Sequence, residues 1–379
     1  TTRHRGTPDF ILLVLTFLLV GFGVVMVFSA SSATSAYHFN DPFYYTKRQI
    51  MWAVLGIAVM LLLMNIPYRK LRPLAFPAFA IVIVLLVLVL MRDPIYGSRR
   101  WFSIGPFGLQ PSEFAKLGII LYFAHLISKK GEKVRDFQKG LLPLLIIAAI
   151  TAGLIMMQPD FGATAIFLCC AMAVIIAGGV NLKHFFAVSL AGGSLAAAFI
   201  SFNLLFSDRF EYIKFRVTSF LDPWQDPYNT GYNLIHSLLA FGHGGTFGAG
   251  IGQSIQKLHY LPFTHNDFIL PVIGEELGFI GLVTFLLIYL FFLWRALLIG
   301  LRSKDQYCTL VAVGIVTLFG TQSIINFGGV TGSIPISGVT FPFISYGGSS
   351  LLSSMISVGI LLSISRENNR LEKEKNSTN

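Results

Sequence analysis

Charged residues are scarce in this chain. Asp, Glu, Lys and Arg together make up 12% of the 379 residues, whereas hydrophobic residues make up 54%. The mean hydropathy is +0.69. Soluble globular domains are about 25% charged, so this composition excludes a domain whose whole surface faces water. It predicts a polytopic membrane protein.

Cysteine and acidic residues are also few. Cys169, Cys170 and Cys308 all fall in apolar stretches and share no metal-ligand spacing, which excludes a disulfide framework. The 28 basic residues outnumber the 18 acidic ones, giving a formal net charge of +10. We do not expect nucleic acid as a partner, because the basic residues gather in the loops of one membrane side.

Apolar stretches long enough to cross a bilayer as helices recur along the chain. We predict an all-α polytopic integral membrane protein, a single domain over residues 1–379, with about ten transmembrane helices. The predicted spans are 10–30, 50–66, 74–91, 113–128, 141–157, 161–180, 185–206, 268–293, 307–327 and 345–364.

Orientation follows from the loops between these spans. Most Lys and Arg residues lie on the side of the N-terminus, and short cytoplasmic loops retain such residues. The N-terminus is therefore predicted to be cytoplasmic. The long segment 207–266, between the seventh and eighth spans, then becomes a large extracytoplasmic loop. It contains a glycine-rich run at 242–252 and an amphipathic stretch at 232–241.

A carboxylate stands at the start of the eighth span. Asp267 follows His265 and Asn266 and precedes the apolar run 268–273. A charged side chain at the edge of a membrane is energetically expensive and indicates a functional site. The alternative is that Asp267 only caps the helix that follows.

Two further places combine ionisable groups with helix starts. Glu113 and Lys116 are three residues apart, on one face of a helix that begins near Pro111. They form either a cap with its ion-pair partner or part of a site that faces an outer cavity. Asp160, in the tight turn after the fifth span, either caps the sixth span or belongs to the same site.

An outer loop places Arg99 and Arg100 next to Trp101. A basic pair beside an aromatic residue anchors a protein at lipid headgroups, or it clamps an anionic lipid-linked group. The sequence leaves both readings open.

Polar residues deeper in the spans are predicted to be structural. Glu275 and Glu276 favour an ion pair that fixes helix packing, and Gln322 and Asn326 favour hydrogen bonds between helices. The Gly- and Pro-rich stretch 328–350 is tolerated at membrane depth only where it is buried or lines a cavity. We expect it to back the cavity that contains Asp267.

Taken together, several motifs resemble the SEDS family of shape, elongation, division and sporulation proteins, and in particular its division and sporulation branch. The resemblance covers nearly the whole chain. The motifs are GSRRW (97–101), LQPSEFAKL (109–117), QPDFG (158–162), HNDF (265–268), GEELGFIG (274–281) and PFISYGGSS (342–350).

The chain departs from the family pattern near the proposed base. Phe263 replaces a usual acidic residue and Asn266 a usual Thr, while Asn233 and His236 stand where Gln is usual. These changes bear on fine positioning. They leave Asp267 in place.

The resemblance implies a peptidoglycan glycosyltransferase of the cytoplasmic membrane. It would polymerise lipid II at the outer face for division or sporulation septum synthesis and release undecaprenyl pyrophosphate. Asp267 is the expected catalytic base, because this chemistry needs a proton acceptor at the attacking hydroxyl. The expected substrate-binding residues are Arg99, Arg100, Glu113, Lys116, Asp160, Arg209, Arg216, His265 and Ser349.

A divalent cation, Mg²⁺ or Mn²⁺, that bridges Asp267 and a pyrophosphate would fit this chemistry. The resemblance also implies a class B penicillin-binding transpeptidase and division or sporulation proteins as partners. Two alternatives are a lipid II transporter (flippase) and a scaffold for a partner synthase. A transporter needs a path through to the cytoplasm, whereas the isolated charges are predicted at outer helix ends, which favours the enzyme.

Overall fold

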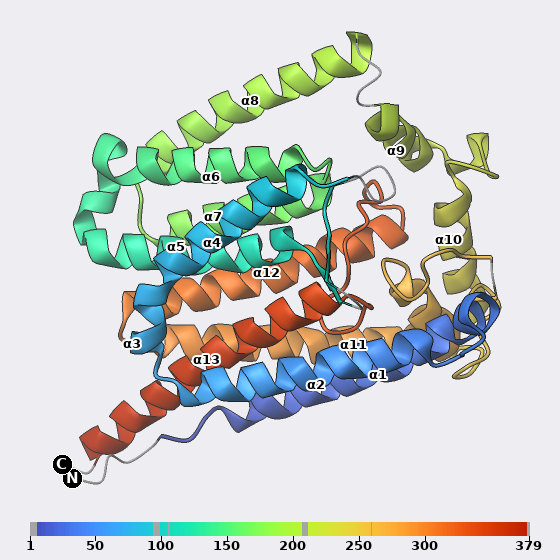
Figure 1. The fold of residues 1–379 in the computed structure, drawn as a ribbon, viewed down its shortest axis with the longest axis horizontal. Coiled ribbons are helices and arrows are strands. Elements are labelled where there is room, and N and C mark those ends of the chain that lie inside the picture. The colour runs from blue at the N-terminus through green and yellow to red at the C-terminus, as the bar shows by residue number, and fades with distance from the viewer. Residues whose placement is uncertain (1–5, 94–98, 105–106, 207–210, 259, 377–379) are drawn as a thin grey trace.

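The computed structural model describes residues 6–93, 99–104, 107–206, 211–258 and 260–376. It is a bundle of long helices that run roughly side by side (Figure 1). Both termini lie at one end of the bundle, which we call the terminal end. The opposite end carries α9 and α10 and is called the site end.

Most helical elements follow one another with short connections, and the longer connections are 91–110, 245–268 and 331–347. In chain order they are α1 (Phe10–Phe39), α2 (Tyr44–Asn65), α3 (Tyr68–Leu71), η1 (Arg72–Leu74), α4 (Ala75–Leu90), α5 (Pro111–Lys130), η2 (Gly131–Arg135), η3 (Phe137–Leu141), α6 (Leu142–Met156), α7 (Phe161–Ala177), α8 (Leu182–Phe206), α9 (Glu211–Leu221), η5 (Pro223–Gln225), α10 (Tyr232–Gly244), α11 (Ile269–Leu301), α12 (Gln306–Val330) and α13 (Gly348–Asn376).

Each predicted span coincides with a helix, which confirms an all-helical polytopic membrane protein. Within the described residues, seven helices are long and apolar enough to cross a membrane. The predicted spans outside that set correspond to α5, α7 and α8. α7 has only 17 residues, and α5 carries charged residues in both its first and last turns. α8 runs continuously through Gly192 and Gly193.

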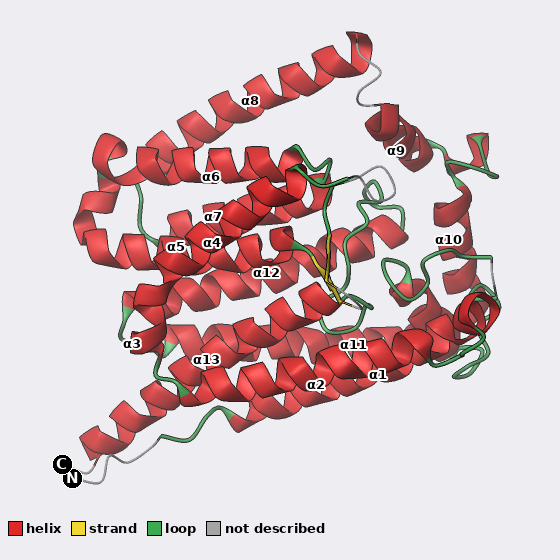
Figure 2. Cartoon of the chain, in the orientation of Figure 1, coloured by secondary structure: helices red, strands yellow, loops and turns green. Residues whose placement is uncertain are grey.

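Two features of the site end were not predicted from the sequence. Residues before α5 form an antiparallel hairpin of β1 (Phe102–Ile104) and β2 (Phe107–Leu109), in which Phe102 pairs with Leu109. These strands lie near the first turn of α13 (Figure 2). The second is α9, which lies after the seventh predicted span; α10, by contrast, coincides with the amphipathic stretch identified at 232–241.

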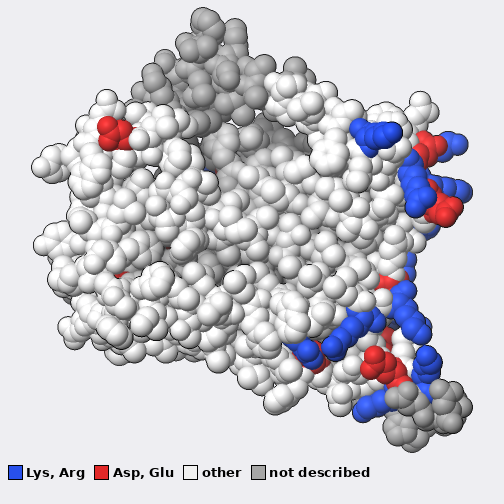
Figure 3. All heavy atoms as spheres, turned by 180° about the vertical axis from the view of Figure 1, so that it is seen from behind, with Lys and Arg blue, Asp and Glu red and all other residues white. Residues whose placement is uncertain are grey.

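Charge is distributed unevenly over the surface. Lys and Arg side chains gather at the terminal end, and the middle of the bundle shows almost none (Figure 3). Membrane proteins keep basic residues in their cytoplasmic loops and leave the surface that contacts lipid apolar. The distribution is therefore the one expected of a multi-pass membrane protein.

The buried core holds the helices that carry the predicted site. α5 packs against α4, α7 and α12. Its buried side chains below the first turns are apolar, including Ile119, Ile120 and Phe123. α13 packs along α2 and also contacts α5. These contacts fix the first turns of α5, α7 and α13 around one space at the site end.

The glycine-rich stretch docks on a break in α11. Gly278 has φ 71°, which interrupts the helix and leaves backbone groups without intrahelical partners. The stretch supplies those partners: the amide of Gly250 donates to the carbonyl of Glu276 at 3.0 Å. A Cβ at Gly248 would lie 2.2 Å from that same carbonyl oxygen, so only glycine permits the approach. The glycine-rich stretch 242–252 is thus fastened to α11, the helix that follows Asp267.

Candidate active site

A cavity of about 460 Å³ opens at the site end of the bundle. It combines acidic, basic and aromatic side chains with backbone from the 338–348 stretch. Its lining residues are Arg48, Trp52, Arg100, Trp101, Gly108, Gln110, Glu113, Lys116, Asp160, Ala163, Phe263, Asn266, Asp267, Gly338, Val339, Thr340, Tyr346, Gly347, Gly348 and Ser350. The structure therefore brings together five of the predicted residues from four separate segments.

Asp267 lies in the turn before α11 and is half-buried at the cavity wall. It is not a helix cap: the N-cap position of α11 is Phe268, and no side chain caps this helix. No described residue donates a hydrogen bond to its carboxylate oxygens. Burial raises the pKa of Asp267 to about 6, partly offset by the positive charge of Arg216. A carboxyl with these properties can exchange a proton near neutral pH.

Arg216, on α9, approaches Asp267 from the other side of the 334–338 stretch. A Cβ on Gly338 would lie 3.4 Å from Asp267 Oδ2 and 3.8 Å from a terminal nitrogen of Arg216. Burial lowers the pKa of Arg216 to about 10, and the guanidinium stays charged at neutral pH. Arg216 lines a neighbouring cavity of about 280 Å³ between α9, α10 and this stretch. It lines this smaller cavity and lies near the carboxylate of Asp267, which faces the larger one.

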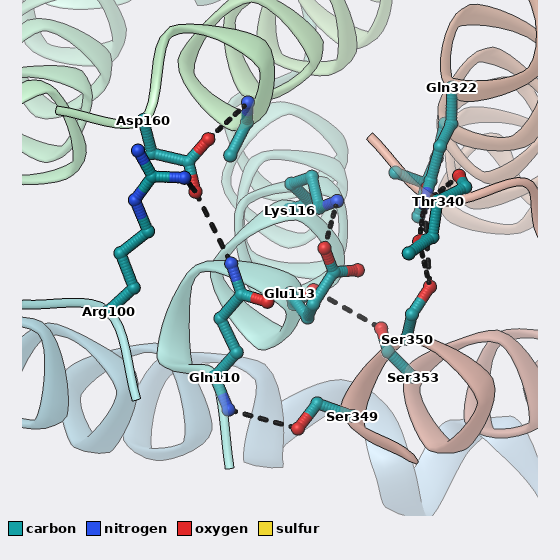
Figure 4. Close-up of polar contacts among 12 residues, drawn as sticks. Arg100, Gln110, Glu113, Lys116, Asp160, Gln322, Thr340, Ser349, Ser350 and Ser353 are labelled. Carbon is teal, nitrogen blue, oxygen red and sulfur yellow. Dashed lines mark hydrogen bonds and ion pairs between the residues drawn. The ribbon is translucent and has the colours of Figure 1, made fainter. Parts of the chain in front are cut away.

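Asp160 caps α7 and also lines the cavity, so the cap is confirmed and the role in substrate binding stays a prediction. Its Oδ1 accepts from the amide of Ala163 at 3.1 Å, which caps α7. Its Oδ2 accepts from Gln110 Nε2 at 3.3 Å and pairs with Arg100 at 3.7 Å (Figure 4). The Arg100 Nε also donates to the carbonyl of Gln158 at 3.0 Å. Arg100 is thus a positioned cation at the cavity wall.

Glu113 and Lys116 form the predicted ion pair on one face of α5, with Nζ and Oε1 2.7 Å apart (Figure 4). Lys116 is 1% exposed, so its charge depends on this partner. The backbone carbonyl of Glu113 also accepts from Ser353 on α13 at 3.2 Å. Both members of the pair line the cavity.

Gln322 and Asn326 lie on one face of α12 and hold the irregular backbone behind the cavity. Asn326 Nδ2 donates to the carbonyls of Asp267 at 2.9 Å and Val339 at 2.6 Å. Gln322 Nε2 donates to the carbonyl of Thr340 at 3.1 Å (Figure 4). These amides position the backbone on both sides of the candidate base, as expected for structural hydrogen bonds.

Four predicted residues do not line this cavity. Arg99 is exposed, and its Nη1 donates to the carbonyl of Leu90 at 3.0 Å. His265 is buried and stacks on Tyr45, with ring centroids 4.1 Å apart. Ser349 bridges the hairpin to α13, because it donates to the carbonyl of Gly108 and accepts from the amide of Gln110. The fourth, Arg216, is described above with its neighbouring cavity.

Arg209 falls outside the described residues. Sequence reasoning missed other residues that line the cavity, among them Arg48, Trp52 and Tyr346. Arg48 and Trp52 are one turn apart on α2, far in sequence from every motif. An aromatic residue and a basic residue at this spacing are the only signal that could have indicated them.

Comparison with known proteins places this geometry in context. Residues 10–370 match the model of a family described as "Cell cycle protein", FtsW/RodA/SpoVE. The chain is 40% identical over 368 residues to stage V sporulation protein E of Bacillus subtilis (strain 168), covering 96% of this chain and 99% of the relative. It is also 40% identical over 360 residues to the probable peptidoglycan glycosyltransferase FtsW of Geobacter metallireducens, covering 94% of each.

Solved structures give the same answer for the fold. A chain from a structure described as "Structural coordination of polymerization and crosslinking by a peptidoglycan synthase complex" superposes with a TM-score of 0.77 at 27% identity, covering 95% of this chain and 98% of that one. The rod shape determining protein RodA of Thermus thermophilus superposes with a TM-score of 0.69 at 28% identity, covering 95% and 97%. The fold is thus that of a RodA-like multi-pass membrane protein.

The chain belongs to the FtsW/RodA/SpoVE family, the SEDS proteins. Five of the six motifs contribute residues to the cavity, whereas GEELGFIG contacts the glycine-rich stretch. The family assignment made from those motifs is confirmed.

Proposed function

We propose that this protein is a peptidoglycan glycosyltransferase that polymerises lipid II into glycan strands at the outer face of the cytoplasmic membrane, for division or sporulation septum synthesis. Family membership supports the reaction class. One structural observation carries the proposal: Asp267, a carboxylate with no hydrogen-bond donor among the described residues, faces a cavity that also holds Arg100 and Lys116.

In this reaction Asp267 takes the proton from the hydroxyl of the acceptor sugar. The hydroxyl oxygen attacks the anomeric carbon of the donor, and the bond to undecaprenyl pyrophosphate breaks. A base must lie within hydrogen-bond reach of that hydroxyl. The leaving pyrophosphate gathers negative charge, which preorganised cations stabilise. Arg216 and Arg100 are the cations whose charges act on Asp267 itself.

The expected Mg²⁺ or Mn²⁺ would need ligands from the substrate. Among the described residues, no group of three or more His, Cys, Asp or Glu side chains could hold a metal ion. Asp267 offers one carboxylate, and Mg²⁺ is commonly held by one or two carboxylates together with substrate phosphates. The cation would supply charge neutralisation at the pyrophosphate. Its affinity in the absence of substrate should therefore be low.

The partner proposal extends from the superposed structure. That chain comes from a complex described as a peptidoglycan synthase that polymerises and crosslinks. A class B penicillin-binding transpeptidase supplies crosslinking, so it is the proposed partner here, together with division or sporulation proteins. A scaffold role alone would not need an isolated carboxylate in a charged cavity.

The transporter alternative requires a polar path between the two ends of the bundle. The cavity charges stop at Lys116, and the following buried residues of α5, Ile119, Ile120 and Phe123, are 0% exposed and apolar. Polar substrates cross such a layer only at a high desolvation cost. This observation favours an enzyme that works from one side.

The direct test is a polymerisation assay. Purified protein is incubated with lipid II and Mg²⁺ or Mn²⁺, with and without a class B transpeptidase, and the products are separated on a gel. Glycan polymer in either arm supports the proposal. Transport of lipid II across vesicles without any polymer would instead support the flippase.

Sidedness is tested by cysteine labelling in intact cells. Ser254 and Lys257 are buried, so they are poor labelling sites even though they belong to the outer segment. Gln253 is exposed at the site end, and Lys133 is exposed in the connection between α5 and α6 at the terminal end. An impermeant reagent should label Gln253→Cys and leave Lys133→Cys unlabelled; the reverse pattern would invert the orientation.

A further inference from the structure

The terminal end contains a second cavity, of about 440 Å³, at the opposite end of the bundle from Asp267. It lies between α3, the α11–α12 turn and α13, in the region where Figure 3 shows basic side chains gathered. Its lining residues are Tyr68, Arg69, Arg72, Ser303, Lys304, Asp305, Asn368 and Leu371. None of them takes part in the reaction proposed above.

Positive charge dominates this cavity. Three lining residues are basic and only Asp305 is acidic. The charge of Asp305 is already compensated, because its Oδ2 accepts from the hydroxyl of Tyr68 at 3.1 Å and lies 3.6 Å from Arg72. Its Oδ1 accepts from the amide of Tyr307 at 3.0 Å. Asp305 therefore opposes an incoming anion less than an uncompensated carboxylate would.

One of the three cations is held in place. Arg72 donates to Ser128 Oγ at 2.8 Å, and its guanidinium lies 5.1 Å from the ring centre of Tyr307. These contacts, together with Asp305, fix its side chain in advance of binding. Such preorganisation lowers the entropy cost of holding a ligand.

The other two cations are exposed. The side chain of Arg69 is 61% exposed and lies 3.7 Å from Glu367, whose carboxylate also pairs with Arg370 at 3.1 Å. Lys304 is exposed and forms no ion pair with any described residue. Both can reorient toward an anion at little cost, since exposed ion pairs contribute little.

One apolar side chain lines the cavity beside these donors. Leu371 is 39% exposed, and the segments that carry Arg72 and Ser303 also carry exposed leucines, Leu74 and Leu301. A soluble phosphate would leave Leu371 uncovered. A phospholipid can cover it with an acyl chain while its phosphate meets the cations.

We propose that this cavity binds the phosphate of an anionic phospholipid in the leaflet at the terminal end. Basic pockets between membrane helices on the cytoplasmic side bind such headgroups. The reading that competes with it is that Arg69, Arg72 and Lys304 only set topology through the positive-inside bias. A topology signal does not select one lipid from another.

The test is the thermal midpoint of the purified full chain in detergent, titrated with phosphatidylglycerol, with phosphatidylcholine, and with inorganic phosphate. The test variant is Arg69→Gln with Lys304→Gln, because both side chains are exposed; Arg72 is left unchanged for its contacts with Ser128 and Tyr307. The control is Lys133→Gln with Arg135→Gln, also exposed at the terminal end and outside the cavity.

We expect phosphatidylglycerol, and not phosphatidylcholine, to raise the midpoint of the unmodified protein. The test variant should need about 25-fold more phosphatidylglycerol for half the shift, because it removes two basic residues and each one near an anionic surface contributes on the order of fivefold. The control should titrate like the unmodified protein. Equal titration of both variants would overturn the proposal, and so would an equal shift with inorganic phosphate, which would indicate a soluble anion.

Discussion

Two sets of carboxylates lie within ten residues of each other, and their surroundings are opposite. Glu275 is 0% exposed; it accepts from the amides of Ile255 at 3.0 Å and Gln256 at 3.3 Å, and also from Ser254 and His243. Glu276 pairs with Lys257 at 2.8 Å and accepts from Ser29 at 2.6 Å. By contrast, no described residue donates to the carboxylate of Asp267.

The difference separates a structural role from a chemical one. A carboxylate that accepts hydrogen bonds from several groups ties those groups together. Glu275 and Glu276 therefore fasten the segment between α10 and α11 to α11 and to α1. A partly buried carboxylate that accepts no hydrogen bond keeps a raised pKa and stays accessible to a substrate. Asn326 donates a hydrogen bond to the backbone carbonyl of Asp267. The carboxylate of Asp267 accepts none from the described residues.

The largest effect is expected for Asp267→Asn. Asn has nearly the same shape and cannot accept the proton, so lipid II polymerisation should fall by about 10²–10⁴ while the thermal midpoint stays near that of the unmodified protein. The matched control is Asp41→Asn, an acidic residue in the α1–α2 turn that lies outside the cavity. Near-normal polymer on the gel from a folded Asp267→Asn protein would remove the catalytic assignment.

For Glu276→Gln we expect a loss of stability, and no direct loss of catalysis, because the charge of Lys257 is left buried without its partner. Breaking a buried pair costs on the order of 3–5 kcal/mol, so the thermal midpoint should fall and activity should be lost only as the protein unfolds. Glu276→Met with Lys257→Met removes both charges and should recover much of the stability. If the double variant is no more stable than the single one, the pair is not what holds the segment.

The Glu113–Lys116 pair is expected to have both a structural role and a role at the cavity. It is a close pair like Glu276–Lys257, and it also lines the cavity. Single changes, Glu113→Gln or Lys116→Met, should lower stability, and the double change should restore it, because contacting residues are energetically coupled. Polymerisation by the double variant should stay about tenfold or more below normal, since a cation near the pyrophosphate is lost. Normal polymerisation by the stable double variant would limit the pair to a structural role.

The smallest expected effect is on pH dependence. Asp267 must be deprotonated to act as a base, and burial raises its pKa to about 6. As pH falls through 6, the active fraction should fall, leaving kcat/KM about tenfold lower at pH 5 than at its plateau. The measurement is initial polymerisation rate at subsaturating lipid II between pH 5 and 8. A profile that is flat down to pH 5 would show that the group is not the base or that its pKa is not raised.

Much of the fold and part of the site could be predicted from the sequence. Long apolar runs specify helices because an unpaired backbone is too costly in lipid, and each predicted span became one. Ionisable residues near helix starts marked Asp267, Asp160, Glu113 and Lys116, and a basic pair in a loop marked Arg100; all five line the cavity. His265 and Ser349 lie outside the cavity lining, because a polar side chain in an apolar setting can serve packing as easily as substrate.

The sequence by itself determined that this is a membrane bundle of the SEDS family, because hydropathy and local motifs are encoded in neighbouring residues. Only the tertiary structure decided which carboxylates accept hydrogen bonds from the protein and which one is left available to a substrate. Ser29 meets Lys257 and Glu276, each more than two hundred residues away in sequence, and Arg48 and Trp52 reach the cavity from α2. Such contacts depend on how helices pack across the bundle, and no local spacing along the chain encodes them.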